Sequence, residues 1–495
     1  MSYLEVVRVA APEAIVVLTA LLVLSADLLA MRDIELRFRL GVGALISTAG
    51  CLLAIGWMLA LPEEGNVVGG MMGMDPMVRI AKVALLVLTI LTLVLSLETN
   101  FTEHVGEYFA LVLLASAGMM FLVSAQDILL IFISLELTSL SLYILAAFNK
   151  RSMKSSEAAL KYFLLGGLSA AFTLFGLSFV YGVSGATNLG QIAAAIHGPK
   201  LEPLLILGLV LTVTGFGFKV AAAPFHLWAP DVYEGAPTPS AAFIGSASKV
   251  AGFLVLARLM VLGFQGAEGD GAWAGFTPGW VSALAVIATA SMVLGNLAAI
   301  VQSSVRRLLA YSAVGHAGYM ILGVIAHSGA GLASLLYYVI TYALTVLGAF
   351  GVVSVVQEQA GGDRLGDFAG LSRRAPVLSL CMLVFMLSLA GIPPLAGFFG
   401  KFYLFTSALE GASPRFGLLW LVILAVGMST VSLYYYLQVL KRIYVSDSAN
   451  PATALDVPLL RLAPLVLLAV TTVVLGCAPN LLIGGLTTVL HTAGM

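Results

Sequence analysis

The chain has 495 residues, of which 60% are hydrophobic and only 10% are charged, and its formal net charge is −1. Soluble domains carry about 25% charged residues, so this composition excludes a soluble globular protein and indicates a polytopic membrane protein. Three scattered cysteines without CxxC spacing indicate neither a metal nor an iron–sulfur site, and the near-zero charge does not indicate nucleic-acid binding.

Apolar runs recur along the whole chain. Roughly 20 consecutive apolar residues span a bilayer as a helix, and the pattern predicts an all-α fold with about fourteen transmembrane helices. The predicted spans, in chain order, are 12–31, 40–61, 77–98, 106–124, 127–148, 158–182, 203–231, 239–263, 280–302, 307–327, 331–357, 375–411, 416–440 and 460–478. The first residues lack a basic region followed by a cleavage site, so we expect the first helix to be retained.

The basic residues of the loops predict the orientation, because cytoplasmic loops collect Lys and Arg. The loops after odd-numbered helices hold Arg32, Arg37, Arg39, Lys150, Arg151, Lys154, Arg306, Arg307, Arg364, Arg373, Arg374, Lys441, Arg442 and Arg461. The other side has only Arg8, Lys200 and Arg415, and its loops carry Glu63, Glu64, Glu268 and Asp270. Both termini are therefore predicted to be periplasmic.

Four charged residues interrupt the predicted spans. Glu136 lies in helix 5, and the lysines Lys219, Lys249 and Lys401 lie in helices 7, 8 and 12. Charge at bilayer depth is costly, so each of these residues indicates a functional site, most often part of an ion or proton path.

Two of the predicted helices are interrupted by helix breakers. Helix 7 contains Pro224 and Pro230, and helix 12 contains Gly391, Pro393 and Pro394. Broken helices at membrane depth persist only where they are buried in protein or line a hydrated cavity. The two helices are five apart, and an odd offset means that they cross the membrane in opposite directions. This pattern predicts two inverted five-helix repeats, helices 4–8 and helices 9–13.

The repeats divide the sequence into four predicted segments. They are an N-terminal three-helix segment at 1–100, the first repeat at 101–265, the second repeat at 266–445, and helix 14 with its tail at 446–495. No P-loop is present, and no GxGxxG follows a strand, so no nucleotide site is predicted.

Three stretches carry a resemblance to a known family: Lys219 to Pro239, RRLLAYSAVGHAGYM at 306–320 and GIPPLAGFFGKFYLF at 391–405. They resemble the antiporter-like proton-channel subunits of complex I and of Mrp-type sodium/proton antiporters. Within that family the chain is most similar to the subunit N group of bacterial NADH:quinone oxidoreductase. It ends after about fourteen helices, whereas subunit L continues with a long lateral helix. Its helix 12 charge is Lys401, where subunit M has a glutamate, and helix 8 also carries a lysine.

The resemblance implies a proton relay of Glu136, Lys219, Lys249 and Lys401. Glu136 matches the helix 5 glutamate that pairs with the helix 7 lysine, Lys219. Lys249 matches the central relay lysine, and Lys401 matches the terminal relay charge. The alternative for the Glu136–Lys219 pair is a static ion pair that orients two helices, and the alternative for Lys249 is packing through an amine that snorkels.

Two interpretations remain open for each of three accessory residues. His226 lies just beyond Pro224 and could bridge water to Lys219 or Lys249, or bond freed helix carbonyls. Glu157 lies four residues before Lys161 and forms a local ion pair or helps to position Glu136. His316, like its neighbour Tyr319, could carry protons or be a satisfied core residue.

The resemblance implies a subunit of a translocase that moves protons while quinone is reduced elsewhere. It implies no redox cofactor or metal in this chain, with NADH, FMN, iron–sulfur clusters and quinone held by partner subunits. The implied partners are the antiporter-like subunit M, small subunits of the K and J type, and membrane lipid, in a bacterial inner membrane. The alternatives are an Mrp-type cation/proton antiporter subunit, a paralogue of the subunit M type, and a structural membrane subunit whose charges guide assembly.

Overall fold

The computed structural model describes residues 3–60, 65–97, 101–196, 201–273, 276–411, 417–447, 455 and 457–492. Within these ranges, twelve helical spans are long and apolar enough to cross a membrane, and two shorter apolar helices, α8 and α16, begin the predicted broken helices. The prediction of an all-α polytopic membrane fold is confirmed. Four predicted loop charges, Glu63, Glu64, Lys200 and Arg415, lie outside the described residues.

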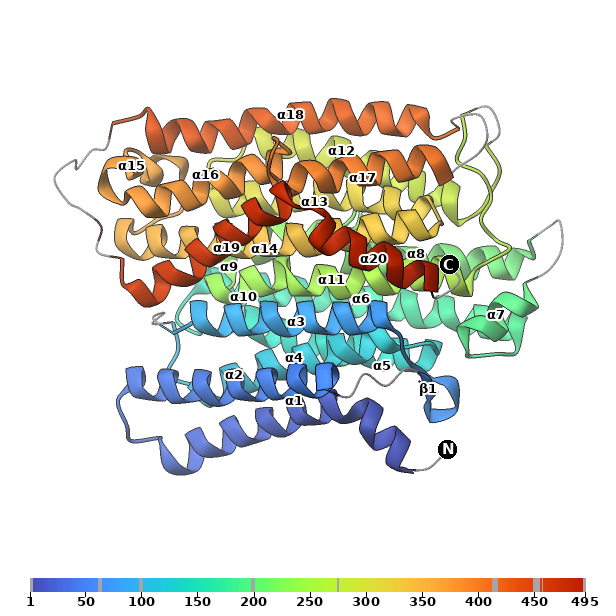
Figure 1. Ribbon diagram of the computed structural model, residues 1–495, viewed down its shortest axis with the longest axis horizontal. Coiled ribbons are helices and arrows are strands. Elements are labelled where there is room, and N and C mark those ends of the chain that lie inside the picture. Colours follow the sequence, from blue (N-terminus) through green and yellow to red (C-terminus); the bar gives the residue numbers. More distant parts are fainter. Residues whose placement is uncertain are drawn as a thin grey trace. The chain divides into compact units, whose positions relative to one another are not determined.

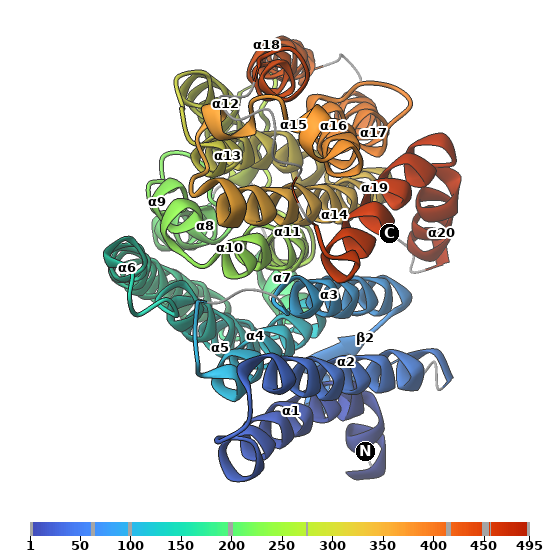
Figure 2. The same cartoon turned by 90° about the vertical axis from the view of Figure 1, so that its left-hand side faces the viewer.

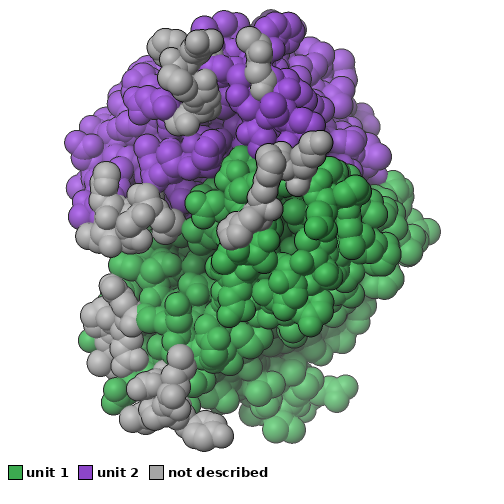
Figure 3. All heavy atoms as spheres, turned by 90° about the vertical axis from the view of Figure 1, so that its right-hand side faces the viewer, with its two compact units in different colours: residues 1–216, 235–268 green, residues 217–234, 269–495 purple. Residues whose placement is uncertain are grey.

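The chain forms two compact units, which Figure 3 distinguishes by colour. Unit 1 comprises residues 1–216 and 235–268, and unit 2 comprises residues 217–234 and 269–495. The helices of unit 1 are α1 (Tyr3–Ala30), α2 (Leu36–Ala60), α3 (Pro76–Leu95), α4 (Val105–Ser124), α5 (Ile128–Ala146), α6 (Met153–Ser184), α7 (Leu189–Ala195), most of α8 (Pro203–Lys219), α10 (Thr238–Gly245), α11 (Ala247–Arg258) and the π turn η2 (Leu259–Gly263).

The first helices of unit 1 pack as neighbours. Helix α1 packs against α2 and α4, and α3 packs against α2, α4, α10 and α11 (Figures 1 and 2). Between α2 and α3 lies a small antiparallel hairpin, β1 (Gly65–Val67) and β2 (Met72–Met74), joined by the single turn η1 (Val68–Gly70). The apolar pattern did not indicate this hairpin.

Unit 2 is also helical. Its elements are α9 (Trp228–Gly235), α12 (Trp280–Ile300), α13 (Val305–Ile325), α14 (Gly329–Ala360), η3 (Leu365–Phe368), α15 (Leu371–Arg374), α16 (Pro376–Ala390), α17 (Ala396–Gly411), α18 (Leu419–Tyr444), α19 (Leu459–Cys477) and α20 (Asn480–Thr492). Helix α14 is almost wholly buried at the centre of this unit, where it packs against α13, α16, α17, α19 and α20.

The two predicted helix breaks are confirmed, but Pro230 lies in the first turn of α9 and not in the break, since proline is tolerated at that position. Helix α8 ends at Lys219, and the chain resumes as a helix only at Trp228, after Pro224. The freed backbone groups of this break find partners: the Ala223 N–H donates to Ser291 Oγ over 2.8 Å, and Trp228 Nε1 donates to the Phe218 carbonyl over 3.0 Å. The break is therefore held by hydrogen bonds, as irregular backbone at membrane depth requires.

Helix 12 breaks between α16 and α17. Gly391 follows the last residue of α16 in the left-handed conformation, with φ of 85°, and α17 begins five residues later at Ala396. Glycine adopts this conformation without the strain that a Cβ would add. The break therefore occurs where the sequence places Gly391, Pro393 and Pro394.

Helix 8 differs from the prediction of one continuous span. It divides into α10 and α11 at Ser246, and it ends in the wider π turn η2. The hydroxyl of Ser246 donates to the Ala242 carbonyl and that of Ser248 donates to the Ile244 carbonyl, each over 2.6 Å. Side-chain bonds of this kind compete with the helical backbone and bend helices.

The two predicted repeats share an element pattern. Each begins with a helix pair, α4–α5 or α12–α13, in which the second helix is capped by Asp127 or Ser304. These caps form isolated bridges to Asn188 and to Arg364, in the segments that follow the 32-residue helices α6 and α14. The shared pattern supports a repeat. Its inverted orientation and the four segment boundaries remain predictions.

Candidate functional site

The predicted site residues divide between the two units. Glu136, Glu157 and Lys249 belong to unit 1, and Lys219, Lys401 and the two histidines, His226 and His316, belong to unit 2. The predicted pair of Glu136 and Lys219 joins residues of different units, so it stays a prediction.

Lys219 occupies the last turn of α8, directly before the break. The last turn of a helix exposes unpaired carbonyl groups and carries a partial negative charge, which favours an ammonium group. His226 follows in the same break and is buried, and its ring lies 6.3 Å from the ring of Tyr311. Among the described residues, His226 Nδ1 has no hydrogen-bond partner, so this nitrogen has capacity for a water molecule or a proton.

Lys249 lies in the first turn of α11, just after the division of helix 8 at Ser246. Its side chain is 1% exposed. The amine is therefore too deeply buried to snorkel to the surface, and this observation weighs against the packing alternative.

Lys401 belongs to α17, but its amine reaches back to the end of α16. Nζ donates to the carbonyls of Leu389 and Ala390 over 2.9 and 3.0 Å, and to Ser429 Oγ over 2.8 Å. The side chain is 4% exposed, and Nζ lies 5.2 Å from the centre of the Tyr319 ring. The ammonium group thus caps the broken end of α16 and has a π face beside it.

A chain of buried polar side chains surrounds His316 on α13. His316 Nδ1 lies 2.6 Å from the hydroxyl of Tyr338, and Nε2 lies 3.0 Å from that of Tyr436. The Tyr436 hydroxyl also bonds Ser312. A neutral imidazole has one donor and one acceptor nitrogen, so one tyrosine donates to the ring and the other accepts from it.

A second group of polar side chains lies next to the polar side chains around His316 and extends to the neighbourhood of Lys401. The Tyr435 hydroxyl donates to Asn296 Oδ1 over 2.9 Å, and Asn296 Nδ2 donates to the Tyr319 hydroxyl over 3.1 Å. The rings of Tyr435 and Tyr436 are 4.5 Å apart, and Lys401 lies beside Tyr319. Together, the polar atoms from Tyr338 to Lys401 come from α12, α13, α14, α17 and α18.

The charged start of α13 holds the short helix α9. Arg307 Nη1 bonds Asp231 Oδ1 over 2.8 Å and Glu234 Oε2 over 2.9 Å. The side chain of Arg306 is buried, and its Nε donates to the Tyr233 carbonyl over 2.7 Å. These two arginines, which the sequence placed among the basic loop residues, therefore also hold the segment that follows the break in helix 7.

The two predicted carboxylates of unit 1 have different environments. Glu136 is partly buried on α5, and its Oε1 has no hydrogen-bond partner in the described part of the chain. Glu157 lies 2.7 Å from Lys161 on α6, and both side chains are exposed. The local ion pair that the sequence predicted for Glu157 is present.

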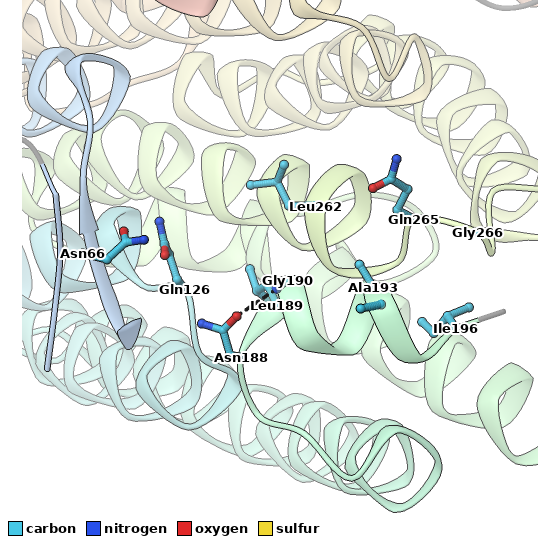
Figure 4. Close-up of a pocket in the computed structure, with 11 residues that line it drawn as sticks. Asn66, Gln126, Asn188, Leu189, Gly190, Ala193, Ile196, Leu262, Gln265 and Gly266 are labelled. Carbon is cyan, nitrogen blue, oxygen red and sulfur yellow. Dashed lines mark hydrogen bonds between the residues drawn. The ribbon is translucent and has the colours of Figure 1, made fainter. Parts of the chain in front are cut away.

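Unit 1 also contains a cavity of about 700 Å³ that is separate from these charged residues. Figure 4 shows the carboxamides of Asn66, Gln126, Asn188 and Gln265 around it, together with residues of α7 and η2. Asn188 is held in place because its Nδ2 donates to the Gly70 carbonyl and its Oδ1 accepts from the Gly190 N–H, both over 3.0 Å. The lining combines these four carboxamides with aliphatic side chains and carries no charge, which distinguishes this cavity from a site built on lysine.

Sequence reasoning missed most of the polar side chains around His316. A mid-span asparagine, Asn296, and the run Tyr434–Tyr436 were the available signals, because polar groups in apolar spans need partners. Within the described ranges, no group of three or more His, Cys, Asp or Glu side chains could hold a metal ion.

Comparisons with known proteins agree with the fold and with the resemblance. The family model described as NADH:quinone oxidoreductase/Mrp antiporter, transmembrane region, matches residues 125–431. NADH-quinone oxidoreductase subunit N 2 of Acidobacterium capsulatum is 52% identical over 490 residues, which cover 97% of this chain and 98% of that protein.

Two solved structures resemble the chain over nearly its full length. A chain of respiratory complex I from Thermus thermophilus has a TM-score of 0.78 and 33% identity, with 96% of this chain and 99% of that chain covered. A chain of the Mrp complex from Dietzia sp. DQ12-45-1b has a TM-score of 0.82 at 20% identity, with coverage of 99% and 98%, which shows a shared fold alone. The chain belongs to the NADH:quinone oxidoreductase/Mrp antiporter family and, within it, to the subunit N proteins of NADH-quinone oxidoreductase.

Proposed function

We propose that this chain is a membrane-arm subunit of a proton-translocating NADH:quinone oxidoreductase, in which a row of buried charges carries protons. Family membership over nearly the whole chain supports the assignment to the complex. The single observation that carries the proton row is the position of the three lysines, because each of them lies next to a break or division of a helix, with Lys249 and Lys401 buried.

Lys219 and the amine of Lys401 lie at the carbonyl end of a helix, whereas Lys249 lies in the first turn of α11. Lys219 ends α8, Lys249 follows the division between α10 and α11, and Lys401 bonds the last carbonyls of α16. Broken helix ends at membrane depth present unpaired carbonyl groups that stabilise cations, and transporters use such ends to bind ions.

The proposed path begins at Glu136 and Lys219, continues to Lys249 and ends at Lys401. Desolvation disfavours both charged forms of a buried carboxylate and amine, and proximity restores them. Separation of Glu136 from Lys219 therefore favours proton loss from the lysine. Within unit 2, we propose that the hydrogen-bonded side chains around His316 carry the proton toward Lys401.

The remaining assignments follow from membership of the complex. We propose that NADH, FMN, iron–sulfur clusters and quinone bind in partner subunits, with subunit M and small K- and J-type subunits as membrane neighbours. We place the chain in the bacterial inner membrane with both termini periplasmic. The Mrp-type alternative is less well supported, because the likeness to the Mrp complex is at the level of fold and the row has few carboxylates to bind a cation.

The substitution Lys401→Met tests the row, because it keeps the unbranched stem and removes the titratable amine. We expect electron transfer from NADH to a soluble acceptor to persist, since no part of that reaction lies in this chain. Quinone reduction coupled to pumping should fall by about tenfold or more, because a positioned proton carrier contributes roughly 100-fold or more to a proton-transfer step. Both rates are measured on membranes with equal amounts of assembled complex.

Lys401→Arg is the matched variant. It keeps a positive donor for the Leu389 and Ala390 carbonyls, but a guanidinium group does not release its proton. We expect it to assemble like the wild type and to pump as poorly as Lys401→Met. Normal pumping in both assembled variants would remove Lys401 from the path, and rescue by arginine alone would make Lys401 a helix cap.

A further inference from the structure

A second buried ion pair lies outside the proposed row, in the N-terminal three-helix segment. Lys82 on α3 and Glu13 on α1 approach to 2.5 Å between Nζ and Oε1, and both side chains are 0% exposed. Several residues one turn away on the same helices are apolar and buried, among them Val9, Val16 and Val78, whereas the half-buried Arg79 lies one turn before Lys82. Apolar side chains therefore line a large part of the surroundings of the pair.

This pair is incompletely satisfied. Among the described residues, neither carboxylate oxygen of Glu13 and no N–H of Lys82 has a partner with hydrogen-bond geometry. A buried ammonium group has three donors and a carboxylate has about four acceptor positions, so one close contact leaves most of this capacity unused. A pair that serves only to hold two helices together would gain from full hydrogen bonding, and an apolar pair would pack at least as well.

The other ion pair of α1 provides a contrast. Asp27 accepts from Arg39 Nε over 2.8 Å, from Arg39 Nη2 over 2.7 Å and from the Gly106 N–H over 2.9 Å. This pair is bidentate, is bonded to a third helix and lies near the helix ends. It has the geometry of a structural tie, which the Glu13–Lys82 pair lacks.

The helix that carries Lys82 also contacts the helix of a proposed relay lysine. Helix α3 packs against α10 and α11, and α11 carries Lys249 and Arg258. Arg258 is occupied, because it donates to the Val123 carbonyl and contacts Asp75. Apart from the Asp27–Arg39 pair, the other charged side chains that the structure describes on the helices around Glu13 and Lys82 are Arg8, Arg37, Arg79 and Glu107, of which Arg79 lies one turn before Lys82.

We propose that Glu13 and Lys82 form a second buried proton-exchange site, which takes up and releases protons in addition to the row of Glu136, Lys219, Lys249 and Lys401. In the exchange, a proton moves from Lys82 Nζ to Glu13 Oε1; one N–H bond breaks, one O–H bond forms, and no electrons are lost or gained. The resulting neutral pair binds a further proton at the amine and releases it again. The ligand of the site is the proton, supplied through water.

Lys82→Arg is the discriminating variant, because it keeps the positive charge and the ion pair while removing the exchangeable amine. We expect the complex to assemble and to pump at least about twofold more slowly than the wild type, since one proton carrier is lost. Arg39→Lys, the reverse exchange in the Asp27 pair, serves as the control and should pump normally. Wild-type pumping in assembled Lys82→Arg would overturn the proposal.

A neutral variant and a spectroscopic measurement complete the test. The assembled double variant Glu13→Gln/Lys82→Met should also pump slowly, and the pH-induced infrared difference spectrum of the wild-type complex should contain a protonated-carboxyl band that Glu13→Gln removes. Three outcomes would instead show that the Glu13–Lys82 pair only holds the helices together. They are wild-type pumping in the double variant, absence of the carboxyl band in the wild type, and failure of both Lys82→Arg and the double variant to assemble. Lys401→Met measured alongside separates this outcome from failure of the row itself.

Discussion

At the residue scale, His316 is the side chain whose environment most restricts its chemistry. Both ring nitrogens face tyrosine hydroxyls, Tyr338 on one side and Tyr436 on the other, in a fully buried setting. In the relay that we propose, a proton that arrives at one nitrogen is matched by release from the other, and the chain is reset when the hydroxyl groups rotate and the imidazole returns to its first tautomer. Such a step needs no movement of the backbone.

The substitution Tyr436→Phe tests that chemistry, because it deletes one hydroxyl and preserves the ring. We expect pumping per assembled complex to fall by about tenfold, since a positioned proton carrier contributes roughly 100-fold or more to such a step. Proton translocation is measured against electron transfer in the same vesicles. The control is Tyr337→Phe, because the Tyr337 hydroxyl donates to the Leu475 carbonyl. Equal pumping in the two variants would contradict a role for Tyr436.

The sequence could indicate the buried charges but not these partners. A charge in an apolar span can be recognised from the sequence alone, as at Lys219, Lys249 and Lys401. Tyr436 and Ser312 are 124 residues apart, and their contact exists only through the packing of α13 against α18. Tyrosine is also common in membrane helices, so its presence alone does not distinguish a polar chain from ordinary packing.

At the element scale, the break in helix 7 depends on neighbours as well as on proline. The Ala223 N–H has Ser291 Oγ on α12 as its acceptor, and Arg307 holds α9 through Asp231 and Glu234. Proline explains where the helix ends. The neighbouring helices explain why the irregular segment has one defined conformation.

Ser291→Ala should destabilise this break. It leaves the buried Ala223 N–H without its acceptor, which costs about 1–3 kcal/mol. We expect a lower thermal midpoint of the assembled complex, or a smaller assembled fraction. Thr289→Val on the same helix is the matched control, because the Thr289 hydroxyl has no hydrogen-bond partner among the described residues. An equal loss in both variants would show that Ser291 contributes only through packing.

The helix breaks differ in how well the sequence predicts them. Pro224 and the Gly391–Pro394 stretch are strong breakers and give the positions of two breaks directly. Ser246 divides helix 8 through side-chain bonds to helix carbonyls, and Gly245–Ser246 within an apolar run is too weak a signal. The hairpin β1–β2 and the short helix α7 are likewise set by tertiary contacts with their neighbours.

At the scale of the whole molecule, the helix count determines the side of the membrane that each loop faces. The twelve long spans, with the broken helices α8–α9 and α16–α17, give the fourteen predicted crossings. Helix α20 was not predicted, but its 13 residues reach only about 20 Å, which is less than the roughly 30 Å hydrocarbon core. We therefore expect that it does not add a crossing.

A topology reporter tests this count and the predicted orientation together. An even number of crossings returns the chain to the side of the membrane where it began. The basic residues concentrate in loops after odd-numbered helices, which predicts that these loops are cytoplasmic and both termini periplasmic. We expect alkaline phosphatase fused after His491 to be active, which requires the periplasm, and the same enzyme fused after Gly362 to be inactive.

Because α20 is too short to cross, the position after Cys477 should behave like that after His491. Activity after Gly362 with none after His491 would reverse the orientation, and unequal results at Cys477 and His491 would make α20 a further crossing and contradict the count of fourteen.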